Sequence, residues 1–169
     1  YVSMLSHEVG RYFSDMTSGG EVPELRYSSH ALYDGIPAPL STVDTSKIQN
    51  ILYDRLTANV DRECAAGSTL WGIHKDDVSL MINGREAKLY ASQGQQRSVA
   101  LSLKLAEAEI ANKLGGEYPV ILLDDVFSEL DEKRRKYILD ILSADDESKR
   151  QIIITSCEPD IIPKERLSH

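Results

Sequence analysis

The sequence predicts an α/β fold in which an incomplete parallel sheet accompanies a helix-rich lobe that carries a β-hairpin. Three observations predict this fold. The apolar run within Val120–Asp125 ends in two acids, as a buried parallel strand often does. A helical pattern and a second apolar run at 151–155 follow it, which gives the strand–helix–strand crossover of a parallel sheet. Earlier, the pair Asn83-Gly84 separates two strand-like segments, which is typical of a tight hairpin.

The first third of the chain predicts two helices joined by irregular structure. Residues 2–17 carry apolar side chains at steps of three and four, the spacing of an amphipathic helix. A short extended piece is expected at 24–29, and residues 34–45, rich in Pro, Gly, Ser and Thr, predict a surface loop. A second helix, capped by Thr45 or Ser46, is expected to end near Gly67.

Strand-like segments and one long helix make up the middle third. The predicted strands are 69–73, 78–82 and 86–90, and the last two flank the Asn83-Gly84 turn. Residues 92–114 predict a long helix with two apolar stripes, which indicates burial on two sides. The stripes are Val99, Leu103, Ala106, Ile110 and Leu114, and Leu101, Leu105 and Ala108.

The last third supplies the parallel strands. A strand ending at Asp124 leads to a helix from about Asp131 to Leu142 and then to the strand 151–155. Two or three parallel strands leave open edges, so we expect the missing strands to come from elsewhere. We expect two parts: residues 1–114, a helix-rich lobe, and residues 115–169, which carry the paired acids.

Composition limits the possible functions. With 19 basic and 27 acidic residues, the net charge is −8, so this chain by itself is expected to bind DNA poorly. Its one basic cluster, Lys133–Lys136, predicts a solvated helix face. There is no secretory start and no apolar run long enough for a membrane span. Cys64 and Cys157 suit a reducing compartment, and the chain starts at Tyr1, so we expect a cytoplasmic fragment of a longer protein.

The segment Ser92–Arg97, which reads SerGlnGlyGlnGlnArg, opens the long helix. Gly94 lets the backbone approach an anion, and the helix start directs free N–H groups and its positive dipole end at that anion. The hydroxyl of Ser92 and the amides of Gln95 and Gln96 add donors. A simple Ser-initiated helix cap is the alternative interpretation.

The paired acids predict a second piece of chemistry. Asp124 and Asp125 lie at the carboxyl end of a strand, where open α/β sheets bind ligands. One acid could ligate Mg²⁺, and the other could orient or deprotonate a water molecule. Alternatively, the pair begins a turn and one acid caps the next helix. Because Ser128 or Asp131 can supply that cap, we favour the functional interpretation. The sequence contains no Gly-x-x-x-x-Gly-Lys-Ser/Thr loop to hold phosphates.

Together the two motifs resemble the signature, Walker B and D-loop series of ABC-type ATPases, and their spelling resembles the RecF family within the ABC/SMC-like group. The resemblance covers roughly Thr69 to Ser156. Four blocks in the same order carry it: Gly72–Asp77, Leu80–Ala87, Ser92–Ser98 and Leu122–Asp131. The resemblance implies the C-terminal part of a P-loop ATPase that lacks the Walker A half.

The resemblance also implies roles for individual residues. Ser92, Gln93, Gly94 and Gln95 match the signature motif, which contacts the γ-phosphate of ATP held by the other subunit. Asp124 matches the acid that positions Mg²⁺, and Asp125 matches the catalytic residue that polarises the attacking water, although Glu is commoner there. The D-loop, which lines the dimer interface, matches Ser128–Asp131, so Ser128 and Asp131 are further expected nucleotide-site residues. Thr155 and Ser156 fall where many relatives carry a histidine.

The implied function is a weak ATPase that binds ATP, Mg²⁺ and DNA as an ATP-dependent homodimer. It would help to load recombinase at single-strand gaps or stalled forks together with the mediator proteins RecR and RecO. No membrane is expected among its partners. The fragment alone is expected to be inactive. Two alternatives are a non-catalytic interaction module and another SMC-like repair ATPase. Long heptad arms would mark the latter, and this sequence has none.

Overall fold

The computed structural model describes residues 1–30, 38–42, 44–127, 130–143 and 150–157. The chain divides into two compact units. The first unit combines residues 1–23 with 82–169, and the second consists of residues 24–81.

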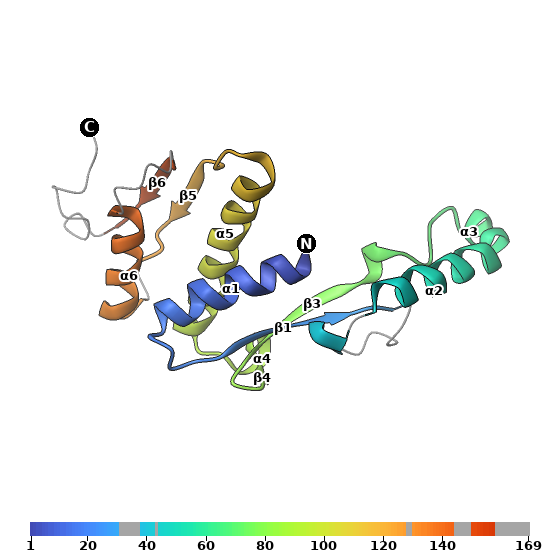
Figure 1. Cartoon of the computed structure of the whole chain (residues 1–169), viewed down its shortest axis with the longest axis horizontal. Coiled ribbons are helices and arrows are strands. Elements are labelled where there is room, and N and C mark those ends of the chain that lie inside the picture. Colours follow the sequence, from blue (N-terminus) through green and yellow to red (C-terminus); the bar gives the residue numbers. More distant parts are fainter. Residues whose placement is uncertain (31–37, 43, 128–129, 144–149, 158–169) are drawn as a thin grey trace. The chain divides into compact units, whose positions relative to one another are not determined.

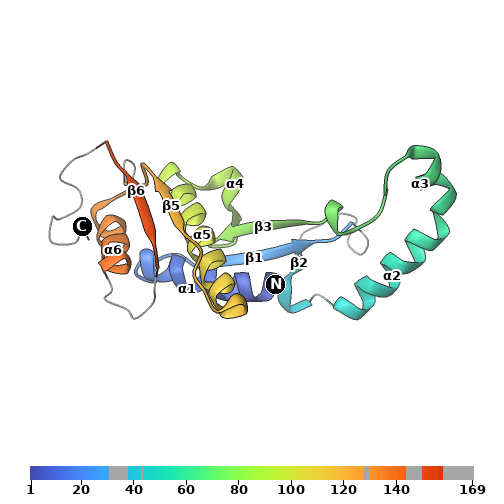
Figure 2. The ribbon, with the colours of Figure 1, turned by 90° about the horizontal axis from the view of Figure 1, so that it is seen from above.

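The first unit contains the parallel strands and the helices around them. Strand β5 (Ile121–Asp124) and strand β6 (Ile152–Thr155) pair in parallel, with Ile121 opposite Ile152 and Asp124 opposite Thr155. Helix α6 (Glu132–Ser143) connects them and lies beside them in both ribbon views (Figures 1 and 2). The predicted strand–helix–strand crossover is therefore confirmed.

Helix α1 (Val2–Met16) packs against helix α5 (Gln93–Gly115) to form the core of this unit (Figure 1). The predicted apolar face of α1 is buried, as are members of both predicted stripes of α5, so that α5 is covered on two sides. The buried residues of α1 are Leu5, Glu8, Val9, Tyr12, Phe13 and Met16, and those of α5 are Ser98, Leu101, Ser102, Leu105, Ala106, Ala108 and Ile110. Leu114, at the end of the first stripe, is exposed.

A buried carboxylate reinforces the packing of α1 on α5. The side chain of Glu8 is 4% exposed, and it accepts hydrogen bonds from Lys113 Nζ at 2.6 Å and Arg11 Nη2 at 2.9 Å. Burial by itself would raise the pKa of Glu8. The hydrogen bonds from Lys113, Arg11 and His7 outweigh that effect and lower this pKa to about 2. Glu8 is therefore ionised in the folded chain at neutral pH.

The second unit consists of a small sheet and a helical segment. Strand β1 (Pro23–Ser28) lies between β2 (Ala38–Pro39) and β3 (Asp77–Ile82), and β1 pairs with β2 in antiparallel fashion. Figure 2 shows β1 and β3 side by side. A 3₁₀ turn, Leu40–Thr42, leads to helices α2 (Thr45–Ala58) and α3 (Val60–Ala66). The predicted single helix is thus divided at Asn59, and Asp44, which accepts from Lys47 N at 3.0 Å, caps it instead of Thr45 or Ser46.

Two predicted strands are wrong, and each for a local reason. Residues 69–73 form no strand, because the carboxylate of Glu63 accepts the backbone N–H groups of Leu70 and Trp71 at 2.6 and 3.2 Å. A 3₁₀ turn, Ile73–Lys75, follows. The predicted strand 86–90 is mostly helix: after the short strand β4 (Arg85–Glu86), helix α4 (Ala87–Tyr90) begins.

The predicted tight turn at Asn83-Gly84 is confirmed. Both residues have positive φ, +49° and +77°, as the sequence pattern requires. Asn83 also bonds Val22 twice: Val22 N donates to Asn83 Oδ1, and Asn83 N donates to Val22 O, both at 2.9 Å. The predicted loop at 34–45 lies partly outside the described residues and contains β2 and the 3₁₀ turn where it is described.

The observed units differ from the expected division into residues 1–114 and 115–169. Helix α1 contacts both α5 and α6, so that residues from the beginning and end of the chain share one core. Residues 24–81 form their own unit between them. Among the described residues, every helix is too short or too polar to cross a membrane.

We predict that Glu8→Gln lowers the free energy of unfolding at pH 7 by about 1 to 3 kcal/mol, because charge-assisted hydrogen bonds to a buried carboxylate are lost. Since the pKa of Glu8 is lowered to about 2 from 4.5, its stabilising effect is present above pH 4.5 and disappears as the pH falls toward 2. Urea unfolding of both proteins between pH 2.5 and 7 measures the difference.

The matched control is Glu107→Gln, which breaks an exposed ion pair with Lys104 on α5 and should change stability little. A Glu8→Gln effect that is equally large at pH 2.5 and pH 7 would contradict the prediction.

Candidate functional site

The two predicted acids lie at the end of β5, where Thr155 of β6 holds them. The Thr155 hydroxyl donates a hydrogen bond to Asp124 Oδ1. The N–H of Asp125 lies 3.1 Å from the carbonyl oxygen of Thr155 and 3.2 Å from its hydroxyl oxygen. Asp124 is exposed, whereas Asp125 is half-buried. Thr155 therefore fixes the side chain of one acid and the backbone of the other.

The strand turns at the second acid. Asp125 has φ +45°, in the left-handed region that few residues other than Gly, Asn and Asp adopt. Consecutive residues of a regular strand point to opposite faces, and this change of backbone direction at Asp125 removes that constraint. Backbone conformations of this kind often occur at functional sites, where the surrounding contacts maintain them.

A cavity of about 350 Å³ lies between α5 and the end of β5. Its lining includes Arg97, Leu101 and Lys104 from α5 and residues 122–126, so both acids border it. The Arg97 guanidinium donates from Nη1 to the carbonyl oxygen of Asp125 at 3.3 Å. Arg97 thus connects the beginning of α5 directly to the backbone of the paired acids.

The predicted anion-binding segment begins α5 and forms a capping box. Ser92 is the N-cap: its hydroxyl accepts from Gln95 N at 3.3 Å, and Gln95 Oε1 accepts from Ser92 N at 2.8 Å. The helix-cap interpretation is therefore correct for Ser92. It leaves the first amides of the helix, those of Gln93 and Gly94, without intrahelical acceptors and available to an anion.

The structure adds two residues to the site: Glu21, which the sequence did not single out, and Arg134, which it predicted to lie on a solvated helix face. Gln95 Nε2 donates to Glu21 Oε1 at 2.8 Å, and Arg134 Nη2 lies 3.6 Å from that same oxygen. Arg134 Nη1 in turn donates to Asp131 Oδ2 at 2.7 Å. Glu21 lies more than 70 residues before Gln95, and no local sequence pattern marks such a contact.

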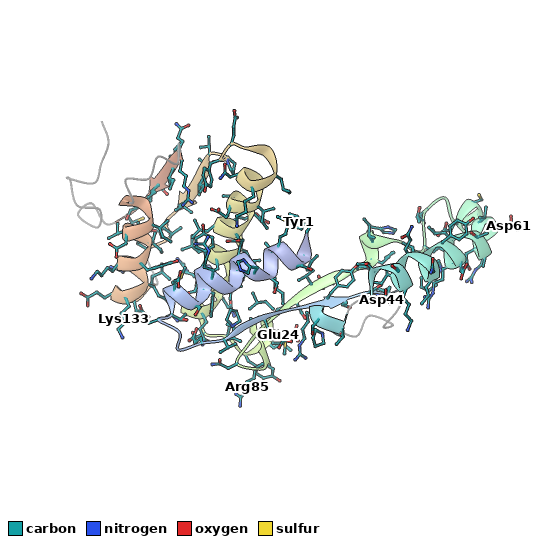
Figure 3. The ribbon with its side chains drawn as sticks, in the orientation of Figure 1. Tyr1, Glu24, Asp44, Asp61, Arg85 and Lys133 are labelled. Atoms are coloured by element: carbon teal, nitrogen blue, oxygen red, sulfur yellow. The ribbon has the colours of Figure 1, made fainter. Side chains whose placement is uncertain are left out.

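Asp131 caps α6, since its Oδ1 accepts from Arg134 N at 2.9 Å. Ser128, the other predicted residue of this segment, lies outside the described residues. The predicted solvated face Lys133–Lys136 is confirmed for two of its four residues and wrong for the other two. Lys133, at the beginning of α6 in Figure 3, and Lys136 are exposed, but Arg134 and Arg135 are half-buried because they bond to residues of the preceding segment.

The donor chemistry at Asp124 fits Mg²⁺. This ion binds hard oxygen ligands and typically takes only one or two protein carboxylates, with phosphate oxygens and water completing its shell. Asp124 offers an exposed carboxylate beside the Thr155 hydroxyl. The described residues hold no group of three or more His, Cys, Asp or Glu side chains placed to form a metal cage by themselves.

Comparison with known proteins identifies relatives over most of the chain, although no family model matches it. A "DNA replication and repair protein RecF" from Clostridium novyi (strain NT) is 42% identical over 139 residues, which make up 82% of this chain and 36% of the relative. The protein of the same name from Enterococcus faecalis (strain ATCC 700802 / V583) is 36% identical over 168 residues, 99% of this chain and 42% of the relative.

Two solved structures of proteins described as RecF are also similar to this chain. One, described as the recombination mediator protein RecF-ATP in the RecFOR pathway, has a TM-score of 0.66 and 34% sequence identity over 95% of this chain. A second, described as RecF-ATPrS in the same pathway, has a TM-score of 0.65 and 33% identity over 96% of this chain. The chain spans about two-fifths of the length of these proteins.

We predict that Asp125→Val lowers the free energy of unfolding by about 1 to 2 kcal/mol relative to Asp125→Gly, because a β-branched residue is strained at φ +45°. Asp125→Asn should stay close to Asp125→Gly. Urea unfolding of the three variants measures the differences. Leu122→Val, at a 70% exposed strand position, is the control for introducing valine. Equal stability of the valine and glycine variants would contradict the prediction.

Proposed function

The chain belongs to the RecF family, and on that premise we propose that it is the signature and Walker B portion of an ATPase that acts in DNA repair. The observation that carries the proposal is a hydrogen bond that connects the helix of the signature-like motif to the paired acids. The helix that begins with Ser92–Gln95 reaches the backbone of Asp125 through Arg97, beside the exposed carboxylate of Asp124. Such an arrangement suits a nucleotide site in which the beginning of α5 and the paired acids Asp124 and Asp125 would move together.

The residues of the site have separate tasks in this proposal. Asp124, oriented by the Thr155 hydroxyl, would hold Mg²⁺, which supplies charge neutralisation beside the phosphates. Asp125 would accept a hydrogen bond from the attacking water and polarise it. The side chain of Asp125 is shorter than that of glutamate by one methylene, and its reach is correspondingly less, which fits a weak ATPase.

The segment Ser92–Gln95 would contact the γ-phosphate of ATP held by a second subunit. The helix-start amides of Gln93 and Gly94 and the helix dipole favour an anion at this position. Gln95 Nε2 donates to Glu21 in this structure, and the Gln95 amide would turn to donate to a phosphate in place of that bond. Asp131 and Ser128 would line the interface between the two subunits. ATP-dependent homodimerisation follows from this division of the site.

The wider biological role is also part of the proposal. The solved relatives are described as recombination mediators in the RecFOR pathway. We extend this to DNA binding, recombinase loading at gaps or stalled forks in the cytoplasm, and cooperation with RecR and RecO. Because the net charge of this chain is −8, most of the phosphate contacts to DNA should come from other parts of the protein.

We predict that Asp125→Asn in a full-length RecF protein carrying this sequence lowers the ATP turnover rate by about 100-fold or more, because the amide cannot accept a proton from water. ATP-dependent dimerisation should remain, since Asn is tolerated at positive φ and keeps the fold. Steady-state hydrolysis and analytical ultracentrifugation with and without ATP measure the two effects. If the variant turns over ATP as fast as the wild type, Asp125 does not have this role. If the wild type itself neither hydrolyses ATP nor dimerises with it, the chain is an interaction module.

The 169-residue chain alone should neither bind ATP tightly nor hydrolyse it, because its sequence has no Gly-x-x-x-x-Gly-Lys-Ser/Thr loop to hold the phosphates. Isothermal titration calorimetry and a phosphate-release assay test this. A turnover rate comparable to that of a full-length protein would contradict the prediction.

A further inference from the structure

Glu21 lies between three segments of the first unit. It follows α1, and its side chain is 19% exposed. One carboxylate oxygen, Oε1, accepts from Gln95 at the beginning of α5 at 2.8 Å and lies 3.6 Å from Arg134 on α6. Glu21 is therefore a contact shared by the two helices that begin at the two nucleotide-site motifs.

Arg134 continues the connection to the second motif. Its side chain is 16% exposed, and Nη1 donates to Asp131, which caps α6. Gln95, Glu21, Arg134 and Asp131 thus form a continuous series of polar contacts. Each contact in the series shares a side chain with the next, which is the arrangement that coupling between the two ends would need.

The contact between Glu21 and Arg134 is incomplete. Among the described residues, neither Glu21 Oε2 nor Arg134 Nε has a hydrogen-bond partner, although both atoms are buried. An arginine and a carboxylate can form two parallel hydrogen bonds, and a rotation of either side chain would bring these two atoms into use. The structure shows the arrangement in which the carboxylate is shared with Gln95, and these two atoms are the ones that a carboxylate facing Arg134 fully would use.

We propose that Glu21 is a positioning residue that couples the signature segment Ser92–Gln95 to Asp131, the cap of α6. In the observed arrangement, Glu21 orients the Gln95 amide. When Gln95 engages a phosphate, Glu21 shifts toward Arg134 and alters the hold of Arg134 on Asp131. This inference rests on the proposed function, because the phosphate belongs to the nucleotide of the second subunit. A static ion pair that only fixes α5 to α6 is the competing explanation.

The test uses a full-length RecF protein carrying this sequence and four single variants: Glu21→Ala, Glu21→Gln, Arg134→Ala and, as the matched control, Glu107→Gln. Glu107 pairs with Lys104 on the exposed side of α5, so its variant removes one acid and one ion pair from the same helix. The double variant Glu21→Ala/Arg134→Ala completes a thermodynamic cycle. The measurements are thermal unfolding, the dimerisation constant with and without ATP, and kcat and KM for ATP.

We expect Glu21→Ala to weaken ATP-dependent dimerisation by about tenfold, Glu21→Gln to weaken it less, and Glu107→Gln to leave it unchanged. Dimerisation without ATP should not change. The double variant should dimerise with ATP about as well as the more impaired of the two single variants, because the two residues act in one series. Equal effects with and without ATP, or a change in thermal unfolding alone, would overturn the proposal in favour of a static ion pair. An additive double variant would overturn it as well, because Glu21 and Arg134 would then act independently.

Failure of the proposed function is recognisable separately. If the wild type neither hydrolyses ATP nor dimerises with it, the ATPase proposal fails, and amide hydrogen exchange without nucleotide still tests whether Glu21 connects the beginnings of α5 and α6, which the coupling requires. Glu21→Ala should then speed exchange at the beginnings of both α5 and α6, whereas Glu107→Gln should not. Faster exchange at residues near position 21 only would overturn the coupling itself.

Discussion

The burial of the apolar face of α1 against α5 is the interaction on which the rest of the first unit depends. Phe13, Val9 and Met16 are almost completely buried there. On α5, Ser98, Ser102 and Ala106 recur every fourth residue and are also fully buried, so small side chains let neighbouring elements approach this helix closely. Because α5 carries both Ser92–Gln95 and Arg97, its position determines where the candidate site forms.

The carboxylates of the core and of the candidate site have different partners. The acids of the core have cationic partners: the buried Glu8 bonds Lys113 and Arg11, and the half-buried Glu109 accepts from Arg150 Nη2 at 3.1 Å. These partners offset the cost of removing a carboxylate from water. Asp124, in contrast, is exposed, and a neutral hydroxyl orients it. A carboxylate in that setting keeps its affinity for an incoming cation.

The two motifs of the candidate site are connected by contacts that differ in how completely their polar atoms are paired. Ser92 and Gln95 form a complete capping box, and Asp131 caps α6, so each helix start has its own capping hydrogen bonds. The contact between them, through Glu21 and Arg134, leaves buried atoms without partners in the described part of the chain. Motion between rigid parts is expected where the connecting contacts are least complete.

The sequence alone determined the elements whose signals are local. The apolar spacing of α1 and α5, the strand ending at Asp124, the crossover to β6 and the Asn83-Gly84 turn all follow from short-range periodicity and turn chemistry. The motif order also identified the candidate site residues and the family resemblance. Local patterns failed at 69–73 and 86–90, because apolar residues in short runs suit a strand or a helical turn equally well.

Only the tertiary structure decided which side chains meet. The roles of Glu21, Thr155 and Arg134 depend on contacts between residues 30 or more positions apart, and polar side chains carry no periodic signal that predicts such partners. The same holds for the positive φ of Asp125, which its neighbours in space maintain against the preference of an isolated residue. Local preferences select helices and strands, whereas the burial and pairing of distant groups select the site geometry.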